Sequence, residues 1–167
     1  MITLENVKKS FNGQPVLRDV SLQVRDGEVV AILGPSGSGK TTLLRCLNFL
    51  ERADAGTLRI GAQTVDLQHA SRQEVLSVRR KTAFVFQNYN LFQNKTAREN
   101  IMEGLVTARH VPKAAAHRKA DEALAWVGLT DKGDAYPAEL SGGQQPRVGI
   151  ARAVVVEPAV GLLDEPT

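Results

Sequence analysis

A glycine-rich segment near the N-terminus has the spacing of a phosphate-binding loop. Residues 34–41 read GPSGSGKT and match the pattern G-x-x-x-x-G-K-[ST]. Glycines allow the backbone to turn its N–H groups toward phosphate oxygens, and a following helix adds partial positive charge. The Lys40 ammonium can then reach the β and γ phosphates, and the Thr41 hydroxyl can ligate Mg²⁺. The sequence therefore predicts a nucleoside triphosphate site made by Gly34, Pro35, Ser36, Gly37, Ser38, Gly39, Lys40, Thr41 and Thr42.

The loop alone is compatible with kinases, GTPases and ATPases. Three further stretches of the sequence narrow this choice. They are LSGGQ at residues 140–144, Gln87 after the apolar run in FVFQNYNLF, and Asp164 with Glu165 after the apolar run in VGLLDEP. Each has an ordinary alternative: a capped helix start, a surface amide and a solvated turn. In this order and at these separations they indicate an ATPase, with Asp164 serving the water shell of the metal.

The LSGGQ stretch has the chemistry of half an anion site. Ser141 is a candidate N-cap for a helix, and Gln144 three residues later would complete a capping box. The backbone of Gly142 and Gly143 leaves room for a phosphate at the helix start. Such a site needs a second surface to enclose the anion, so the pattern predicts a partner.

The elements that must position these residues alternate between strands and helices, which indicates an α/β fold. Apolar and polar residues alternate at residues 2–5 and 20–25, with Asn12-Gly13 between the two stretches. This pattern predicts antiparallel strands that have one solvent-exposed face. The continuous apolar run Val29–Leu33 predicts a strand buried on both faces, directly before the phosphate loop. Further short strands are expected at residues 58–60, 83–86 and 160–163.

Helices are expected after the phosphate loop at residues 41–50, over residues 112–127 and from Ser141 onward. The central one is rich in helix formers, and Gly128 is a plausible C-terminal stop. Its apolar face comprises Ala116, Ala120, Leu124 and Val127.

Composition limits the remaining possibilities. The chain has 167 residues, 43% of them hydrophobic, a net charge of +3 and one cysteine. This length favours one domain with its own core. The basic charge suits anionic partners, but it does not distinguish among nucleotides, nucleic acid and membrane surfaces.

The single cysteine, Cys46, excludes an internal disulfide, and no apolar run approaches the ~18 residues of a spanning helix. We therefore expect a cytosolic chain whose membrane role requires a partner.

Taken together, the motifs resemble those of the nucleotide-binding subunits of ABC transporters, most closely bacterial importers of polar amino acids. The resemblance implies one domain over residues 1–167: a P-loop NTPase core with a parallel sheet, an N-terminal antiparallel β-subdomain and an inserted helical subdomain at about 88–140. It implies ATP and Mg²⁺ as cofactors, and a location on the inner face of the cell membrane. The implied partners are a transmembrane permease, a second copy arranged head to tail and, indirectly, a solute-binding protein, with no nucleic acid.

The resemblance also assigns roles to individual residues. Phe11, just before a glycine of the N-terminal sheet, would stack on adenine, although a core aromatic is the alternative. Glu165 would polarise the attacking water, and Gln87 would sense the γ phosphate and metal together with Asp164. Ser141, Gly142, Gly143 and Gln144 would close over ATP held by the other copy. The segment after Gln87 would contact the permease.

The sequence departs from the family pattern near its C-terminus. It stops at Thr167, before the expected D-loop and switch histidine, and His69, His110 and His117 all lie upstream. The strand that would follow belongs in the middle of the parallel sheet, so the expected fold lacks C-terminal strands of the core. Pro146 and Gly149 are expected to weaken the helix after Ser141, and Gly161 to weaken the last strand.

Separate functional hypotheses follow. One is an ATP-binding subunit that couples ATP hydrolysis to solute import, with polar amino acids as the expected cargo. The other is a truncated copy that at most binds nucleotide, for which we expect ATPase activity at background. An ABC-type protein acting on DNA or ribosomes is a third reading that salt-sensitive nucleic-acid binding would favour. A small-molecule kinase fits less well, because LSGGQ has no role there.

Overall fold

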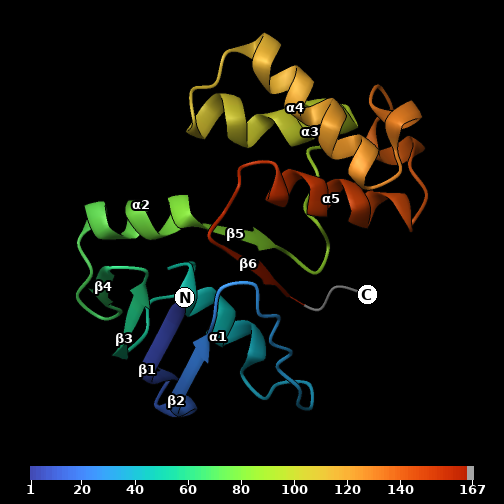
Figure 1. The fold of residues 1–167 in the computed structure, drawn as a ribbon. Coiled ribbons are helices and arrows are strands. Elements are labelled where there is room, and N and C mark those ends of the chain that lie inside the picture. The colour runs from blue at the N-terminus through green and yellow to red at the C-terminus, as the bar shows by residue number, and fades with distance from the viewer. Residues whose placement is uncertain (165–167) are drawn as a thin grey trace. The chain divides into compact units, whose positions relative to one another are not determined.

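The computed structural model describes residues 1–164, in two compact units (Figure 1). The first unit is Met1–Thr82, and the second begins at Ala83 and is described as far as Asp164. Each is described by itself below.

A four-stranded antiparallel sheet forms the first unit, with strand order β2-β1-β3-β4. A long hairpin joins β1 (Ile2–Phe11) to β2 (Gln14–Val24). Its turn residues Asn12 and Gly13 have φ angles of 50° and 78°. Two successive positive φ values match the right-handed twist of the paired strands, which is why Asn-Gly suits this position. The predicted antiparallel strands and their turn are confirmed.

Two short strands and two helices complete the first unit. The strands are β3 (Ala55–Ile60) and β4 (Gln63–Asp66), and the helices are α1 (Lys40–Leu47) and α2 (Arg72–Lys81). Helix α1, expected after the phosphate loop, buries Leu43, Cys46 and Leu47. Helix α2 was not among the expected elements, yet the sequence carries its start signal. Ser71 and Glu74 form a complete capping box there.

The expected buried strand at Val29–Leu33 was wrong for this structure. Residues 28–35 belong to no strand and pair with neither sheet of the described residues. Val29 is 94% exposed and Leu33 is 90% exposed. An apolar run becomes a buried strand only where neighbouring strands satisfy its backbone groups and cover both faces. Residues 1–164 supply no such ladder to this segment.

The second unit joins a two-stranded sheet to a group of helices. Strands β5 (Thr82–Val85) and β6 (Val160–Leu163) are neighbours and run in the same direction in Figure 1. The helices are α3 (Ala97–Glu103), the π-helix η1 (Gly104–Ala108), α4 (Lys113–Trp126), the 3₁₀ turns η2 (Thr130–Lys132) and η3 (Pro137–Glu139), and α5 (Gln144–Val154). Their shared core includes Ile101, Leu105, Ala120, Leu124, Val148 and Ala151.

Helix α4 agrees closely with its sequence pattern. Ala116, Ala120 and Leu124 are buried, together with Ala123, while Val127 is only partly buried after the last turn. Gly128 follows with a φ of 71°, the left-handed conformation that ends a helix at low cost when the residue is glycine. The predicted stop is confirmed.

Helix α5 begins later than its capping pattern suggests, so the expected Ser141 cap was wrong. The helix starts at Gln144, and no side chain caps it. Half of the capping box forms, because the Ser141 backbone N–H donates to Gln144 Oε1 at 2.9 Å. Pro146 is consequently the third helical residue, in the first turn, where N–H groups lack intrahelical partners. It therefore does not interrupt α5, contrary to our expectation.

Candidate functional site

The predicted phosphate loop is closed by its own lysine. Lys40 Nζ donates to the carbonyl oxygens of Gly34 at 2.9 Å and Pro35 at 3.0 Å. The Ser38 N–H also donates to the Pro35 oxygen, at 3.2 Å. The two lysine bonds tie the start of α1 to the first two residues of the loop.

Two glycines of the loop occupy places that a larger residue would strain. Gly37 and Gly39 have φ angles of 79° and 94°. A Cβ on Gly39 would lie 3.0 Å from Leu17 Cδ2 and 3.1 Å from Val16 Cγ1, so the start of α1 rests directly against β2. Glycine is needed here for both the backbone angle and the close approach.

The loop fits a chain of phosphates in its chemistry. Residues 34–38 are exposed, while Lys40, Thr41 and Thr42 at the start of α1 are half-buried. The helix begins at Lys40 and has no acidic residue in its first turn. A helix N-terminus, glycine N–H groups and an ammonium group together favour a polyanion. Thr41, the second helical residue, supplies a hydroxyl of the kind that ligates Mg²⁺.

Phe11 lies at the end of the hairpin that supports this loop. It pairs with Gln14, and two residues further along β2 is Val16, the residue that Gly39 contacts. Phe11 is 41% exposed, and Lys9 Nζ lies 4.9 Å from the centroid of its ring. The exposure argues against the alternative of a core aromatic.

In the second unit, Gln87 and Asp164 follow the ends of neighbouring strands. The Asp164 N–H donates to the Val85 carbonyl oxygen at 3.0 Å. Val85 is the last residue of β5, and Gln87 begins the turn two residues later. Asp164 is 6% exposed, whereas Gln87 is exposed. Carboxyl ends of strands that meet at one sheet edge are a frequent place for ligand-binding residues.

The LSGGQ residues present an open surface at the start of α5. Ser141, Gly142 and Gly143 are exposed, and a Cβ on either glycine would meet no atom within 4 Å. Behind them, Gln145 Nε2 donates to the Pro137 carbonyl oxygen at 3.0 Å and Arg147 Nη1 to the Val127 carbonyl oxygen at 3.5 Å. The exposed loop is thus backed by bonds to η3 and α4.

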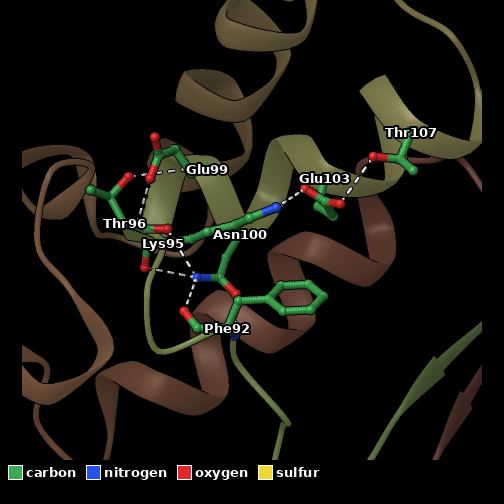
Figure 2. A network of polar contacts seen from close by, with 7 residues as sticks. All are labelled: Phe92, Lys95, Thr96, Glu99, Asn100, Glu103 and Thr107. Carbon is green, nitrogen blue, oxygen red and sulfur yellow. Dashed lines mark hydrogen bonds and ion pairs between the residues drawn. The ribbon is translucent and has the colours of Figure 1, made fainter.

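A buried amide organises the segment that follows Gln87 (Figure 2). Asn100, on α3, is completely buried. Its Oδ1 accepts from the Phe92 N–H at 2.8 Å, and its Nδ2 donates to the carbonyl oxygens of Phe92, Lys95 and Thr96 at 3.0–3.1 Å. Thr96 and Glu99 form a capping box that starts α3. Sequence reasoning missed this network, although T-x-x-E at residues 96–99 was a visible signal for the helix start.

The predicted site residues fall into two sets, one in each unit. Phe11 and the phosphate loop belong to the first unit, and Gln87, Ser141–Gln144 and Asp164 belong to the second. Glu165 lies outside the described residues. Among residues 1–164, no group of three or more His, Cys, Asp or Glu side chains gathers to form a metal centre. His69 Nδ1 instead lies 3.3 Å from Asp66 Oδ2, and His117 Nδ1 lies 3.1 Å from Asp121 Oδ2.

Comparison with known proteins agrees with these observations. A family model described as ABC transporter matches residues 17–167. The chain is 54% identical over 167 residues to "Probable amino-acid import ATP-binding protein YxeO" of Bacillus subtilis, covering 100% of this chain and 67% of that protein. It is 53% identical to "L-cystine import ATP-binding protein TcyN" of the same organism, covering 100% and 64%. The chain thus spans about two thirds of the length of these curated relatives.

A solved structure has the same fold. It is described as the dimeric post-hydrolysis state of the ATP-binding cassette MJ0796 bound to ADP and Pi, and it matches with a TM-score of 0.87 and 35% identity, covering 100% of this chain and 75% of that one. Among the described residues, no helix is both long and apolar enough to cross a membrane. The family model covers most of the chain, and these relatives are more than half identical to it over its whole length. The chain therefore belongs to the ABC transporter family as an ATP-binding domain.

Proposed function

We propose that the phosphate loop binds Mg-ATP and that the chain serves as the ATP-binding component of an importer. The observation that carries the proposal is the closed loop itself, in which Lys40 bonds to the Gly34 and Pro35 carbonyl oxygens at the start of α1. The loop amides and Lys40 would hold the phosphates, and Thr41 would ligate Mg²⁺. When bound, Mg-ATP would supply the phosphoryl group, and its metal ion would neutralise the charge on the phosphate oxygens. Phe11 would stack on the adenine.

We further propose that Gln87, Asp164 and Glu165 carry the hydrolytic chemistry. Asp164 would hold the water shell of the metal, Gln87 would sense the γ phosphate and metal, and Glu165 would polarise the attacking water. Support comes from the Asp164–Val85 bond, which brings the ends of β5 and β6 together.

A head-to-tail homodimer is the proposed working form. Ser141, Gly142, Gly143 and Gln144 would close over ATP held by the second copy. The exposed, unobstructed glycines at the start of α5 support this role. The similar MJ0796 structure is dimeric and holds ADP and Pi.

The proposed cargo is an amino acid of polar type. Relatives that share about half of their residues with this chain are named as amino-acid and L-cystine import proteins. The transport path would belong to a membrane-embedded permease, fed by a solute-binding protein. The chain would then lie on the cytoplasmic face of the membrane, with the segment after Gln87 toward the permease.

Phosphate release and nucleotide affinity, measured together, test this function. We expect the wild-type chain to bind Mg-ATP and Lys40→Met to bind it more weakly. Phosphate release that Glu165→Gln abolishes would support the proposed hydrolytic role, against the background activity expected of a truncated copy. Binding without phosphate release in the wild type would instead favour the non-hydrolysing copy. Absence of Mg-ATP binding would contradict the proposal as a whole.

A further inference from the structure

Helix α5 contacts the turn that carries Gln87 at two points. This turn, residues 87–90, is called the Gln87 turn below. Arg152 Nη1 donates to the Asn90 carbonyl oxygen at 2.9 Å, and Nη2 donates to the Tyr89 carbonyl oxygen. One turn of helix earlier, a Cβ on Gly149 would lie 3.1 Å from Tyr89 Cβ and 3.3 Å from its Cδ1. Residues three apart share one face of a helix, so both contacts come from the same side of α5.

The Gln87 turn has a backbone that needs such support. Tyr89 and Asn90 have φ angles of 55° and 44°, two consecutive left-handed residues of which neither is glycine. Residues other than glycine rarely take this conformation unless the surroundings impose it. The guanidinium fork of Arg152 bonds to the carbonyl groups of these same two residues, and bare Gly149 leaves space for the Tyr89 side chain. Gly149 was expected only to weaken α5, and this packing gives a reason for its presence.

The environment of Arg152 makes the contact strong. Burial lowers the pKa of the Arg152 guanidinium, but an arginine stays charged at neutral pH. Hydrogen bonds from a charged donor are stronger than neutral ones, more so away from water. The guanidinium carbon also lies 5.8 Å from the centroid of the Phe92 ring, in the segment that Asn100 holds.

We propose that Arg152 is a positioning residue, which fixes the Gln87 turn to the helix that begins at the LSGGQ loop. Gln144, the last residue of LSGGQ, is the first residue of α5, and Arg152 lies near the other end. Helix α5 therefore begins at the surface proposed to contact a second copy. Near its other end it carries Arg152, which supports the Gln87 turn. Movement of α5 would move the Gln87 turn with it. This inference rests on the metal and γ-phosphate role proposed above for Gln87.

Hydrogen exchange of the 167-residue chain tests the contact without any nucleotide. In Arg152→Gln, amide exchange in residues 86–91 should accelerate at least about tenfold, because two bonds from a charged donor are lost. Exchange in α4 should stay unchanged. Arg147→Gln is the matched control, since it removes an arginine from the same helix without touching the turn. Equal acceleration in α4 would make Arg152 a general structural residue and overturn the proposal.

A second measurement links the contact to Gln87. Binding of Mn²⁺ in the presence of a non-hydrolysable ATP analogue is compared among wild type, Arg152→Gln, Gln87→Ala and the double variant. We expect the double variant to lose no more Mn²⁺ affinity than Gln87→Ala alone, and Arg152→Lys to recover part of the loss. Gly149→Ala, which crowds Tyr89, should behave like Arg152→Gln. If the losses of Mn²⁺ affinity in the two single variants add up in the double variant, the inference is overturned. If the wild type does not bind Mn²⁺ with the ATP analogue, the proposed function is refuted instead.

Discussion

Asn100 holds the peptide groups of Phe92 from both sides. The Phe92 N–H donates to Asn100 Oδ1 at 2.8 Å, and Asn100 Nδ2 donates back to the Phe92 carbonyl oxygen at 3.1 Å (Figure 2). The same amide nitrogen bonds to the carbonyl oxygens of Lys95 and Thr96. Because Asn100 is completely buried, one side chain fixes the loop between the Gln87 turn and α3.

Replacement of Asn100 should therefore be costly. Asn100→Ala leaves buried backbone groups without partners, and we expect the free energy of unfolding to fall by about 2–4 kcal/mol. Urea denaturation measures the loss, with Asn94→Ala, an exposed position in the same loop, as the control. Equal stability of the two variants would show that the network does not hold the loop.

Gly39→Ala should damage the phosphate loop. The new Cβ would press on Leu17 and Val16 at a φ of 94°, so we expect a stability loss of about 1–3 kcal/mol and weaker nucleotide binding. Gly142→Ala is the matched control for stability, because its Cβ meets no atom within 4 Å. Thermal unfolding and nucleotide titration check both parts. A Gly39→Ala variant as stable as the control would contradict the close approach to β2.

The starts of α2 and α5 should respond differently to loss of a serine. Ser71 caps α2 through its side chain, whereas no side chain caps α5. We expect Ser71→Ala to cost about 1 kcal/mol in unfolding free energy, and Ser141→Ala to cost less than about 0.5 kcal/mol. Chemical denaturation of the two variants distinguishes them. A Ser141→Ala loss as large as that of Ser71→Ala would mean that Ser141 does cap its helix.

Cys46 should make the chain less stable in alkali. Burial raises the pKa of its thiol from 9.0 to about 11. The unfolded chain loses this proton at a lower pH than the folded one, so stability is full below about pH 9 and falls as pH rises toward about 11. The linked loss is on the order of 3 kcal/mol.

Urea unfolding over that pH range, compared with Cys46→Ala, isolates this contribution. Lysine and tyrosine titrate in the same range, but they do so in both proteins. The difference in stability between the two should narrow as pH rises. A difference that stays constant would show that the Cys46 thiol has the same pKa folded and unfolded.

Local signals in the sequence predicted much of the fold, where the residues that decide a structure are close together. The Asn12-Gly13 turn, the apolar face of α4 and its Gly128 stop all depend on short-range backbone chemistry. The phosphate loop was predicted for the same reason. Val29–Leu33 was misjudged because a buried strand depends on neighbours far away in the sequence.

The contacts that sequence reasoning missed are tertiary. Nothing local indicates that Arg152 meets carbonyl groups about sixty positions earlier in the chain, or that Gly149 leaves space for Tyr89. Asn100 likewise reads as an ordinary polar helix residue. Capping boxes at Ser71 and Thr96 were visible and would have located α2 and α3.

Nucleotide titration is the most direct test of the central claim that the loop of residues 34–41 binds Mg-ATP. A fluorescent ATP analogue with Mg²⁺ is titrated into wild type, Lys40→Met and Lys8→Met, the last removing an exposed lysine of the same unit. We predict saturable binding by wild type and Lys8→Met, and affinity at least about tenfold lower for Lys40→Met, because a charged donor to phosphate is lost. Unsaturable binding by the wild type, or equal affinity for all three, would contradict the account.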